Sequence, residues 1–244
     1  MGETAGRSDG WKIALERAHL TNSQFIVAHS QRMADEVQRH YGIAPAKIRL
    51  MYPPVDGERF SPVPSAERAR LRAELKLPDD KAVFLLASTG HRRKGLDLLA
   101  DFFAKTDLPV CLVVAGRPID IAAPHIRYLG YRNDLHNVFR AVDFTVLASI
   151  FEPFGLVGVE SVLCGTPIVA ADNVGCVEVI RAPGQFAFSL ARPQSLGEAI
   201  GRAVATWQAN THRIEDPPAA LGYDPSVEVH VKALLDLAQQ VRAR

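Results

Sequence analysis

The sequence predicts an α/β fold, in which a parallel β-sheet carries helices on both faces. The strand-like segments are mostly apolar throughout, and they alternate with segments of helical periodicity. Both features are typical of parallel sheets, because strands that are covered on both faces have no solvent-exposed side. A segment with four prolines, PPVDGERFSPVP at residues 53–64, interrupts this pattern and is predicted to be a linker.

The segment before the linker is predicted to hold a small number of short elements. Residues 1–10 are polar and contain glycine, which indicates a disordered tail. Ser30 is suited to cap the start of a helix that Gly42 would end, since these residue types favour those positions. The expected helices cover residues 11–20 and 31–41, and the expected strands cover residues 25–28 and 48–52.

The segment after the linker is predicted to form the main sheet. Strands are expected at residues 82–88, 110–115, 126–129, 144–149, 168–171 and 186–190. Helices are expected at residues 66–75, 96–105, 133–142, 177–181, 195–207 and 226–242, and a further one begins near residue 156 and closes at residue 165. We therefore expect two units, residues 1–60 and residues 61–244.

Composition excludes several classes of protein. The formal net charge of +1 provides no general field for nucleic acid, so no nucleic-acid partner is expected. The three cysteines contain no C-x-x-C pair, which argues against a disulfide framework or a zinc site and favours buried thiols in a reduced cytosol. No apolar run is long enough to span a bilayer, and no signal-peptide pattern opens the chain. The sequence predicts a soluble, cytoplasmic protein.

Two loops at strand ends carry basic residues or glycine. Ligands of open parallel sheets collect at the carboxyl ends of the strands, so these loops are candidate binding sites. The loop TGHRRKG at residues 89–95 offers Arg92, Arg93 and Lys94 to a phosphate or diphosphate, although a solvated basic turn explains the same residues. Gly116 and Arg117 follow another strand, and there an ordinary turn is the alternative.

The third loop, FEPFGLVGVE at residues 151–160, places two acids around the start of a helix. Gly155 allows a close backbone approach, and the amides of Leu156 and Val157 are candidates for the unpaired N–H groups that attract anions. Glu160 lies about one turn inside the helix and Glu152 precedes it. The alternative is that both acids are solvated, but the apolar neighbours of Glu160 disfavour this for that residue.

These residues resemble the signature of the retaining glycosyltransferases of GT-B fold known as glycosyl transferases group 1. The resemblance rests on EPFGLVGVE followed by S-x-L-C-G-T-P-I-V-A, and on FIVAHS, KGLDLL and YLGYRNDLHNVFRAVDFTVLAS in the same order. It spans roughly residues 20–205. The HRRKG loop departs from the commoner G-R-x4-K form and is closer to the lipopolysaccharide-core glucosyltransferases. The resemblance implies a Rossmann-like sheet that binds a UDP-, GDP- or ADP-linked sugar as donor.

The resemblance also implies roles for individual residues. Glu160 would bind the ribose hydroxyls of the donor, and Glu152 the hydroxyls of its sugar. Arg93 and Lys94 would neutralise the diphosphate leaving group. The other implied donor contacts are Arg92, Gly116, Arg117, Tyr131 beside the base, and Phe154, Gly155, Leu156 and Val157 around the sugar. The family is metal-independent, so neither a metal nor a cofactor is expected.

Members of this family bind the acceptor in an N-terminal domain, of which residues 1–60 resemble only the last part. The resemblance therefore implies the donor-binding half of a transferase, which is a fragment, a truncated gene product or one subunit of a split enzyme, and which needs an acceptor domain supplied elsewhere. It also implies a cytoplasmic location, with peripheral contact at the inner membrane face, and a glycan or lipid acceptor. A nucleotide-sugar binding module without turnover is the alternative, and an epimerase fits the acidic motif less well. We do not expect His29, which follows the first strand, to be a catalytic base.

Overall fold

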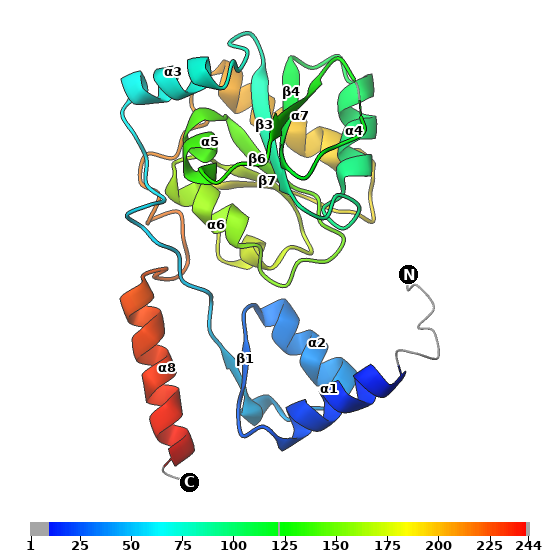
Figure 1. The fold of residues 1–244 in the computed structure, drawn as a ribbon, viewed down its shortest axis with the longest axis vertical. Helices are drawn as coiled ribbons and strands as arrows, with labels where there is room; N and C mark the ends of the chain where they lie inside the picture. Colours follow the sequence, from blue (N-terminus) through cyan, green and yellow to red (C-terminus); the bar gives the residue numbers. More distant parts are fainter. Residues whose placement is uncertain (1–9, 122, 243–244) are drawn as a thin grey trace.

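The computed structural model describes residues 10–121 and 123–242, and it has a sheet domain and a smaller N-terminal part (Figure 1). The polar tail expected over residues 1–10 lies outside the described residues except for Gly10, which begins the first helix. The sheet has six parallel strands in the order β5-β4-β3-β6-β7-β8, which confirms the predicted fold class. They are β3 (Ala82–Ser88), β4 (Val110–Gly116), β5 (Ile126–Gly130), β6 (Phe144–Leu147), β7 (Ile168–Ala171) and β8 (Gln185–Phe188).

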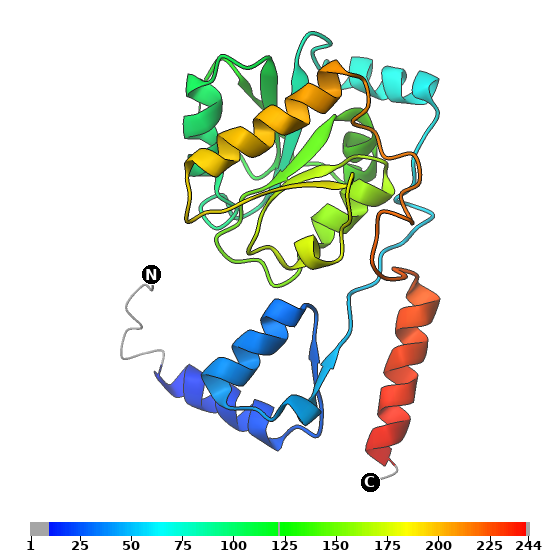
Figure 2. The same cartoon turned by 180° about the vertical axis from the view of Figure 1, so that it is seen from behind.

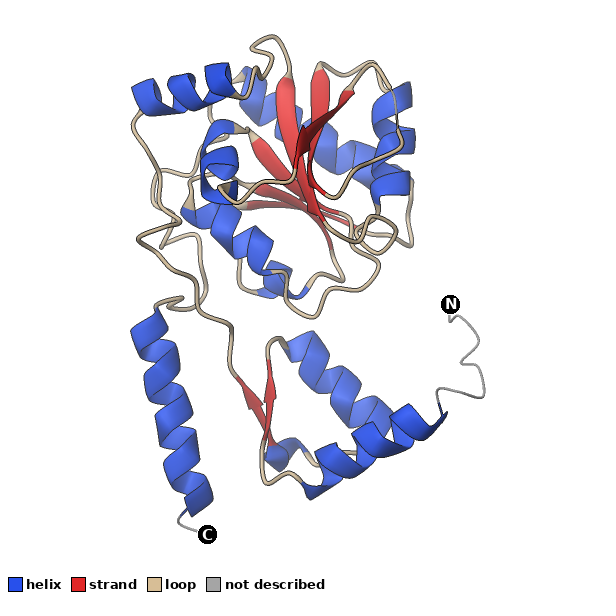
Figure 3. Cartoon of the chain, in the orientation of Figure 1, coloured by secondary structure: helices blue, strands red, loops and turns tan. Residues whose placement is uncertain are grey.

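Helices cover both faces of this sheet (Figures 2 and 3). They are α3 (Ser65–Glu74), α4 (Leu96–Lys105), α5 (Leu135–Ala141), α6 (Leu156–Leu163) and α7 (Gln194–Gln208). Strand β3 shows how one apolar strand serves two layers, because successive side chains point to opposite faces. Phe84 and Leu86 pack in one buried cluster with α4 and α7, whereas Val83 and Leu85 pack in another with α3 and α5. A strand with this environment has to be apolar at every position.

The N-terminal part has its own two-stranded parallel sheet. Its elements are α1 (Gly10–Asn22), β1 (Ile26–Ala28), α2 (Gln31–Tyr41), a 3-10 turn η1 (Pro45–Lys47) and β2 (Ile48–Leu50). The predicted caps of α2 are confirmed. The Ser30 hydroxyl accepts a hydrogen bond from the Met33 amide at 3.0 Å, and Gly42 ends the helix in a left-handed conformation with φ of 68°.

The last helix, α8 (Val227–Arg242), returns to the N-terminal part and does not cover the main sheet (Figure 1). Three contacts join the returning chain to residues 52–55. The Val55 amide donates to the Pro225 carbonyl at 2.8 Å, the Tyr223 hydroxyl donates to the Pro53 carbonyl at 2.9 Å, and a His230 ring nitrogen lies 3.0 Å from the Tyr52 carbonyl oxygen. The start of the linker therefore runs beside the segment that leads into α8. The division of the chain into two units at residue 60 stays a prediction.

One predicted helix takes a different form. Residues 177–181 were expected to be helical, but the segment forms a 3-10 turn, η2 (Gly175–Glu178). The Gly175 and Cys176 amides donate to the Glu152 and Phe154 carbonyls at 3.2 and 2.6 Å. These two hydrogen bonds join the start of the segment to the loop that carries Glu152. The segment therefore begins two residues earlier than predicted and forms a short 3-10 turn in place of the expected helix.

Candidate functional site

The candidate site lies where the strand order of the sheet reverses. The chain proceeds outward from β3 through β4 to β5, and then from β6 on the other side of β3 through β7 to β8. Open α/β sheets bind ligands in the crevice at such a switch point, beyond the carboxyl ends of the strands. The loop after β3 is the basic loop of residues 89–95, and the loop after β6 carries Glu152. The topology thus brings the two predicted loops together.

Backbone contacts fix the basic loop against the end of β6. The Ile150 amide donates to the Arg93 carbonyl at 2.9 Å. Gly95 adopts a left-handed φ of 73°, and a Cβ atom there would lie 2.2 Å from the Ala148 carbonyl oxygen. His91 is also a structural member of this loop, with one ring nitrogen 2.9 Å from the Ser88 hydroxyl and the other 3.0 Å from the Pro118 carbonyl oxygen.

Lys94 and Arg93 both contact Glu152. The Lys94 ammonium forms an ion pair with Oε2 of Glu152, and an Arg93 guanidinium nitrogen lies 3.2 Å from the same oxygen. The side chains of Lys94 and Glu152 are only 11% and 13% exposed, so their attraction is weakly screened by solvent. The Ser149 hydroxyl donates to Oε2 as well, at 3.3 Å. The three residues that the sequence predicted to be catalytic therefore form one cluster.

A cavity of about 280 Å³ opens on the cationic side of this cluster. Of the predicted donor contacts, Arg93, Lys94, Gly116, Tyr131 and Val157 line it. Thr89, at the start of the predicted basic loop, lines the cavity as well, and sequence reasoning missed the other lining residues, which are Ala87, Ser88, Ala115, Arg132 and Leu135. Ser88 stands at the end of a buried strand and next to the basic loop. That position was the sequence signal that could have identified this residue.

The start of α6 completes this side of the site. Gly155 precedes the helix with a left-handed φ of 91°, and no side chain caps the helix start. A helix start leaves backbone N–H groups without an intrahelical partner, which favours an anion there. A Cβ atom at Gly155 would lie 3.0 Å from a Val174 methyl and 3.2 Å from the Glu152 side chain. Glycine is therefore required here for conformation and for space.

The remaining predicted residues differ in how they are placed. The Phe154 side chain is only 4% exposed and packs on Tyr52, with ring centroids 5.9 Å apart. Its ring therefore cannot line a sugar, which corrects that expectation, and only its backbone is left for a ligand. Leu156, Arg92 and Arg117 are exposed and do not line the cavity.

Glu160 is the second acid of the motif, and it is partly buried on α6. Burial raises the pKa of the Glu160 carboxyl, and the charge of Arg59 partly offsets that rise. Glu160 therefore differs from a fully solvated surface acid, and its role toward a ligand stays a prediction. Acids with a raised pKa are typical of functional sites.

Replacing Glu160 with glutamine should increase stability near neutral pH. The folded-state pKa is raised, so the folded protein keeps its proton at pH values where the unfolded chain has lost it. Wild-type stability therefore falls as the pH rises from the unfolded pKa to the folded pKa, whereas the glutamine amide of the variant does not titrate. Urea unfolding across that window should show a stability gain for Glu160→Gln that grows with pH. A gain of the same size in the exposed control Glu198→Gln would contradict this reasoning.

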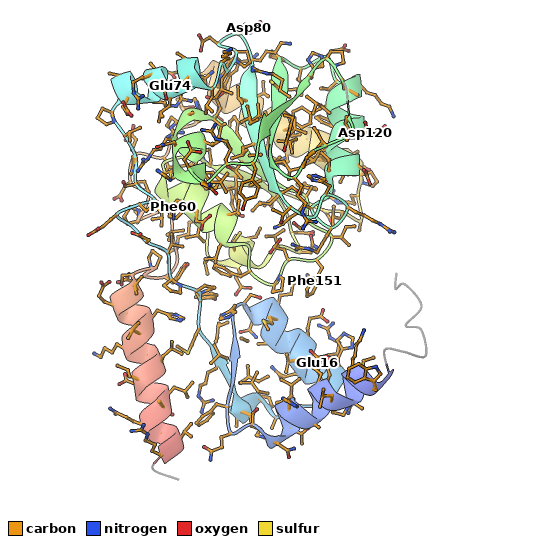
Figure 4. All side chains as sticks on the ribbon, in the orientation of Figure 1. Glu16, Phe60, Glu74, Asp80, Asp120 and Phe151 are labelled. Atoms are coloured by element: carbon orange, nitrogen blue, oxygen red, sulfur yellow. The ribbon has the colours of Figure 1, made fainter. Side chains whose placement is uncertain are left out.

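A second cavity, of about 270 Å³, lies on the other side of Glu152. Residues 150–153 form one wall, and residues of α1 and α2, among them Arg32, Met33 and His40, form the other. The exposed Phe151 faces this boundary between the two parts of the chain (Figure 4). Glu152 therefore separates a cationic cavity in the sheet domain from a mixed apolar and polar cavity beside the N-terminal part.

The fold and the site define a two-part α/β protein that has a crevice lined by Arg93 and Lys94 at the switch point of its sheet. Residues 67–215 match the family "Glycosyl transferases group 1", and residues 2–59 match "Glycosyltransferase Family 4". The first match covers more than half of the chain, so the chain belongs to the glycosyl transferases group 1 family.

Named relatives agree with this assignment. A "probable transglycosylase" of Burkholderia thailandensis is 44% identical over 98% of this chain and 67% of its own length. A D-inositol 3-phosphate glycosyltransferase of Catenulispora acidiphila is 32% identical over 70% of this chain. The match spans 46% of the length of that second relative.

Solved structures share the fold at low sequence identity. Anabaena HepE, solved with UDP-glucose, superposes with a TM-score of 0.81 at 19% identity, over 94% of this chain and 68% of that one. The sucrose-phosphate synthase of Thermosynechococcus elongatus has a TM-score of 0.80 at 21% identity, over 98% of this chain and 64% of that one. No helix in the described ranges combines the length and apolarity needed to cross a membrane.

Proposed function

We propose that the chain binds a nucleotide-diphosphate sugar and belongs to an enzyme that transfers the sugar, with retention and without a metal, to a hydroxyl of a glycan or lipid acceptor. The contact between Lys94, Arg93 and Glu152 carries this proposal. In this contact two cationic side chains meet one carboxylate oxygen. The proposed donor would have its diphosphate beside the cations and its sugar beside the acid. Family membership and the UDP-glucose complex of HepE support the class of ligand.

The chemistry of the leaving group follows from this cluster. In the proposed reaction the bond from the anomeric carbon to the phosphate oxygen breaks, and its electron pair leaves with the diphosphate. The acceptor hydroxyl oxygen forms the new bond to the same face of that carbon, and its proton passes to the departing diphosphate. Lys94, Arg93 and the free amides at the start of α6 stabilise that developing charge, and each such fixed donor contributes about 3 kcal/mol. Glu152 holds the two cations in place before the donor arrives.

The acceptor is proposed to approach from the cavity between Glu152 and α2. The acid lines that cavity directly, so a sugar held by Glu152 would present one side to it. The buried cysteines favour a cytoplasmic location, at or near the inner face of the membrane. We also propose that residues 1–60 are the last part of an acceptor domain, and that full activity requires the rest of that domain to be supplied from elsewhere.

Calorimetric titration with UDP-, GDP- and ADP-sugars tests the donor site. We expect one of the three nucleotides to bind, and the bound nucleotide should protect Lys94 from acylation. Failure of all three to bind would contradict the proposal. Incubation with the bound donor and candidate acceptors then separates a transferase from a binding module, because only a transferase forms a glycosylated acceptor.

The two acids should respond differently to substitution. Glu160→Ala should weaken the binding of the nucleoside diphosphate and of the sugar nucleotide alike, by about tenfold, because the proposed ribose contact is common to both ligands. Glu152→Ala should weaken only the sugar nucleotide, since its proposed partner is the sugar. Titration of each variant with both ligands provides the measurement. An equal loss for both ligands in Glu152→Ala would show that its role is assigned wrongly.

A further inference from the structure

The buried side chain of Ser30 joins the N-terminal part to the loop that carries Glu152. Its hydroxyl donates to the Pro153 carbonyl at 2.6 Å, across 123 residues of sequence, and accepts from the Met33 amide at 3.0 Å. Ser30 is 0% exposed. A single hydroxyl thus caps α2 and holds the residue that follows Glu152.

Two weaker contacts reinforce this junction. The Gln31 amide, in the first turn of α2, donates to the Glu178 carboxylate at 2.7 Å. Burial and the nearby Glu178 carboxylate raise the pKa of the Tyr52 hydroxyl to about 12, and the Tyr52 ring packs on Phe154. Glu178 is exposed, so its charge is screened and the buried Ser30 contact dominates.

The loop is held from the opposite side by its own domain. The Gly175 and Cys176 amides bind the Glu152 and Phe154 carbonyls, as described above. The Pro153 carbonyl lies between these two and points instead to Ser30. Three successive carbonyls are therefore fixed, and the middle one depends on the N-terminal part.

We propose that Ser30 is a positioning residue for donor binding, because its hydrogen bond to Pro153 fixes the backbone from which Glu152 reaches the sugar. This inference rests on the proposed function of the site and extends it. It assigns to the N-terminal part a direct role in holding the donor sugar, besides any role toward the acceptor. The nucleoside diphosphate, which contacts Lys94 and Arg93, depends on Ser30 much less than the sugar does.

The alternative is that Ser30 serves only as a helix cap. Three variants of the full chain distinguish these roles. Ser30→Ala removes both hydrogen bonds, and Ser30→Thr keeps a hydroxyl that can make both. Ser195→Ala is the matched control, because Ser195 is also buried and its hydroxyl donates to the Arg192 carbonyl at 2.6 Å, on α7 and away from the donor loop.

Hydrogen exchange of the ligand-free protein tests the positioning itself. Ser30→Ala should accelerate exchange of the Gly175 and Cys176 amides, which donate to the Glu152 and Phe154 carbonyls on either side of Pro153, by about tenfold, the factor expected for loss of one hydrogen bond. Ser30→Thr should restore slow exchange, and Ser195→Ala should leave these two amides unchanged. Unchanged exchange of both amides in Ser30→Ala would overturn the inference, and this readout requires no donor.

Ligand titrations of the same variants test the expected selective loss of affinity for the sugar nucleotide. The ligands are UDP and UDP-glucose, or the corresponding pair that the wild type binds. Ser30→Ala should raise the Kd of the sugar nucleotide about tenfold and that of the nucleoside diphosphate less than about twofold. An equal loss for both ligands, or an equal effect of Ser195→Ala, would overturn the inference. If the wild type binds no nucleotide while the exchange result holds, the proposed function fails and Ser30 is left with a structural role.

Discussion

Lys94→Ala is expected to weaken binding of a nucleoside diphosphate by about 10- to 100-fold, the range for loss of a hydrogen bond to a charged group. The effect should be large because the Lys94 side chain is only 11% exposed, so water has little access to take the place of the missing ammonium group. In a form of the protein that catalyses sugar transfer, the rate of the transfer step should also fall, by about two to three orders of magnitude. The reason is that the diphosphate carries its full charge only as it leaves. Titration with the diphosphate and single-turnover kinetics measure the two effects.

The control for this variant is Lys105→Ala. Lys105 lies on α4 and pairs with Asp101 one turn earlier, and its side chain is 72% exposed. Removing it changes the net charge of the chain by the same amount and leaves the crevice intact. A similar loss of affinity in both variants would show that only the general charge matters, and would contradict the assigned role of Lys94.

Gly95→Ala is expected to destabilise the fold by about 2–5 kcal/mol. A left-handed conformation costs a residue with a Cβ atom about 1–2 kcal/mol. Displacing the Ala148 carbonyl, which would lie 2.2 Å from that atom, adds about 1–3 kcal/mol. Urea unfolding should show this loss of stability. Nucleotide affinity should fall as well, because the displaced backbone joins the basic loop to the Glu152 loop.

Two other glycines separate the contributions. Gly42 has almost the same φ, 68°, but a Cβ atom there would meet nothing within 4 Å, so Gly42→Ala reports the backbone conformation alone. Gly90 lies in the same basic loop with open space around it and no positive φ. We expect the loss of stability to increase from Gly90→Ala through Gly42→Ala to Gly95→Ala. A loss at Gly95 no larger than at Gly42 would show that the close approach to Ala148 is unimportant.

The amino-acid sequence determined the features that depend on local pattern. Strand β3 and helix α4 begin and end at the predicted residues, because a wholly apolar run and a helical period each have few alternative structures. The caps of α2 were predictable for the same reason, since Ser30 and Gly42 have side-chain or backbone properties that suit those positions. The sequence also identified Lys94, Arg93 and Glu152 as candidates, because acids and bases in glycine-containing loops after buried strands are unusual.

The tertiary structure decided which of these residues meet. Lys94 and Glu152 are 58 residues apart, and only the adjacency of β3 and β6 brings their side chains together. The same applies to η2, whose first two amides bind the carbonyls of Glu152 and Phe154, and to the Phe154 ring, which is buried against Tyr52. The sequence did not predict the contact between Ser30 and Pro153. A helix cap depends on neighbouring residues, whereas this hydrogen bond joins residues that are 123 positions apart. Local sequence determines elements, whereas contacts between distant loops depend on the order of strands in the sheet.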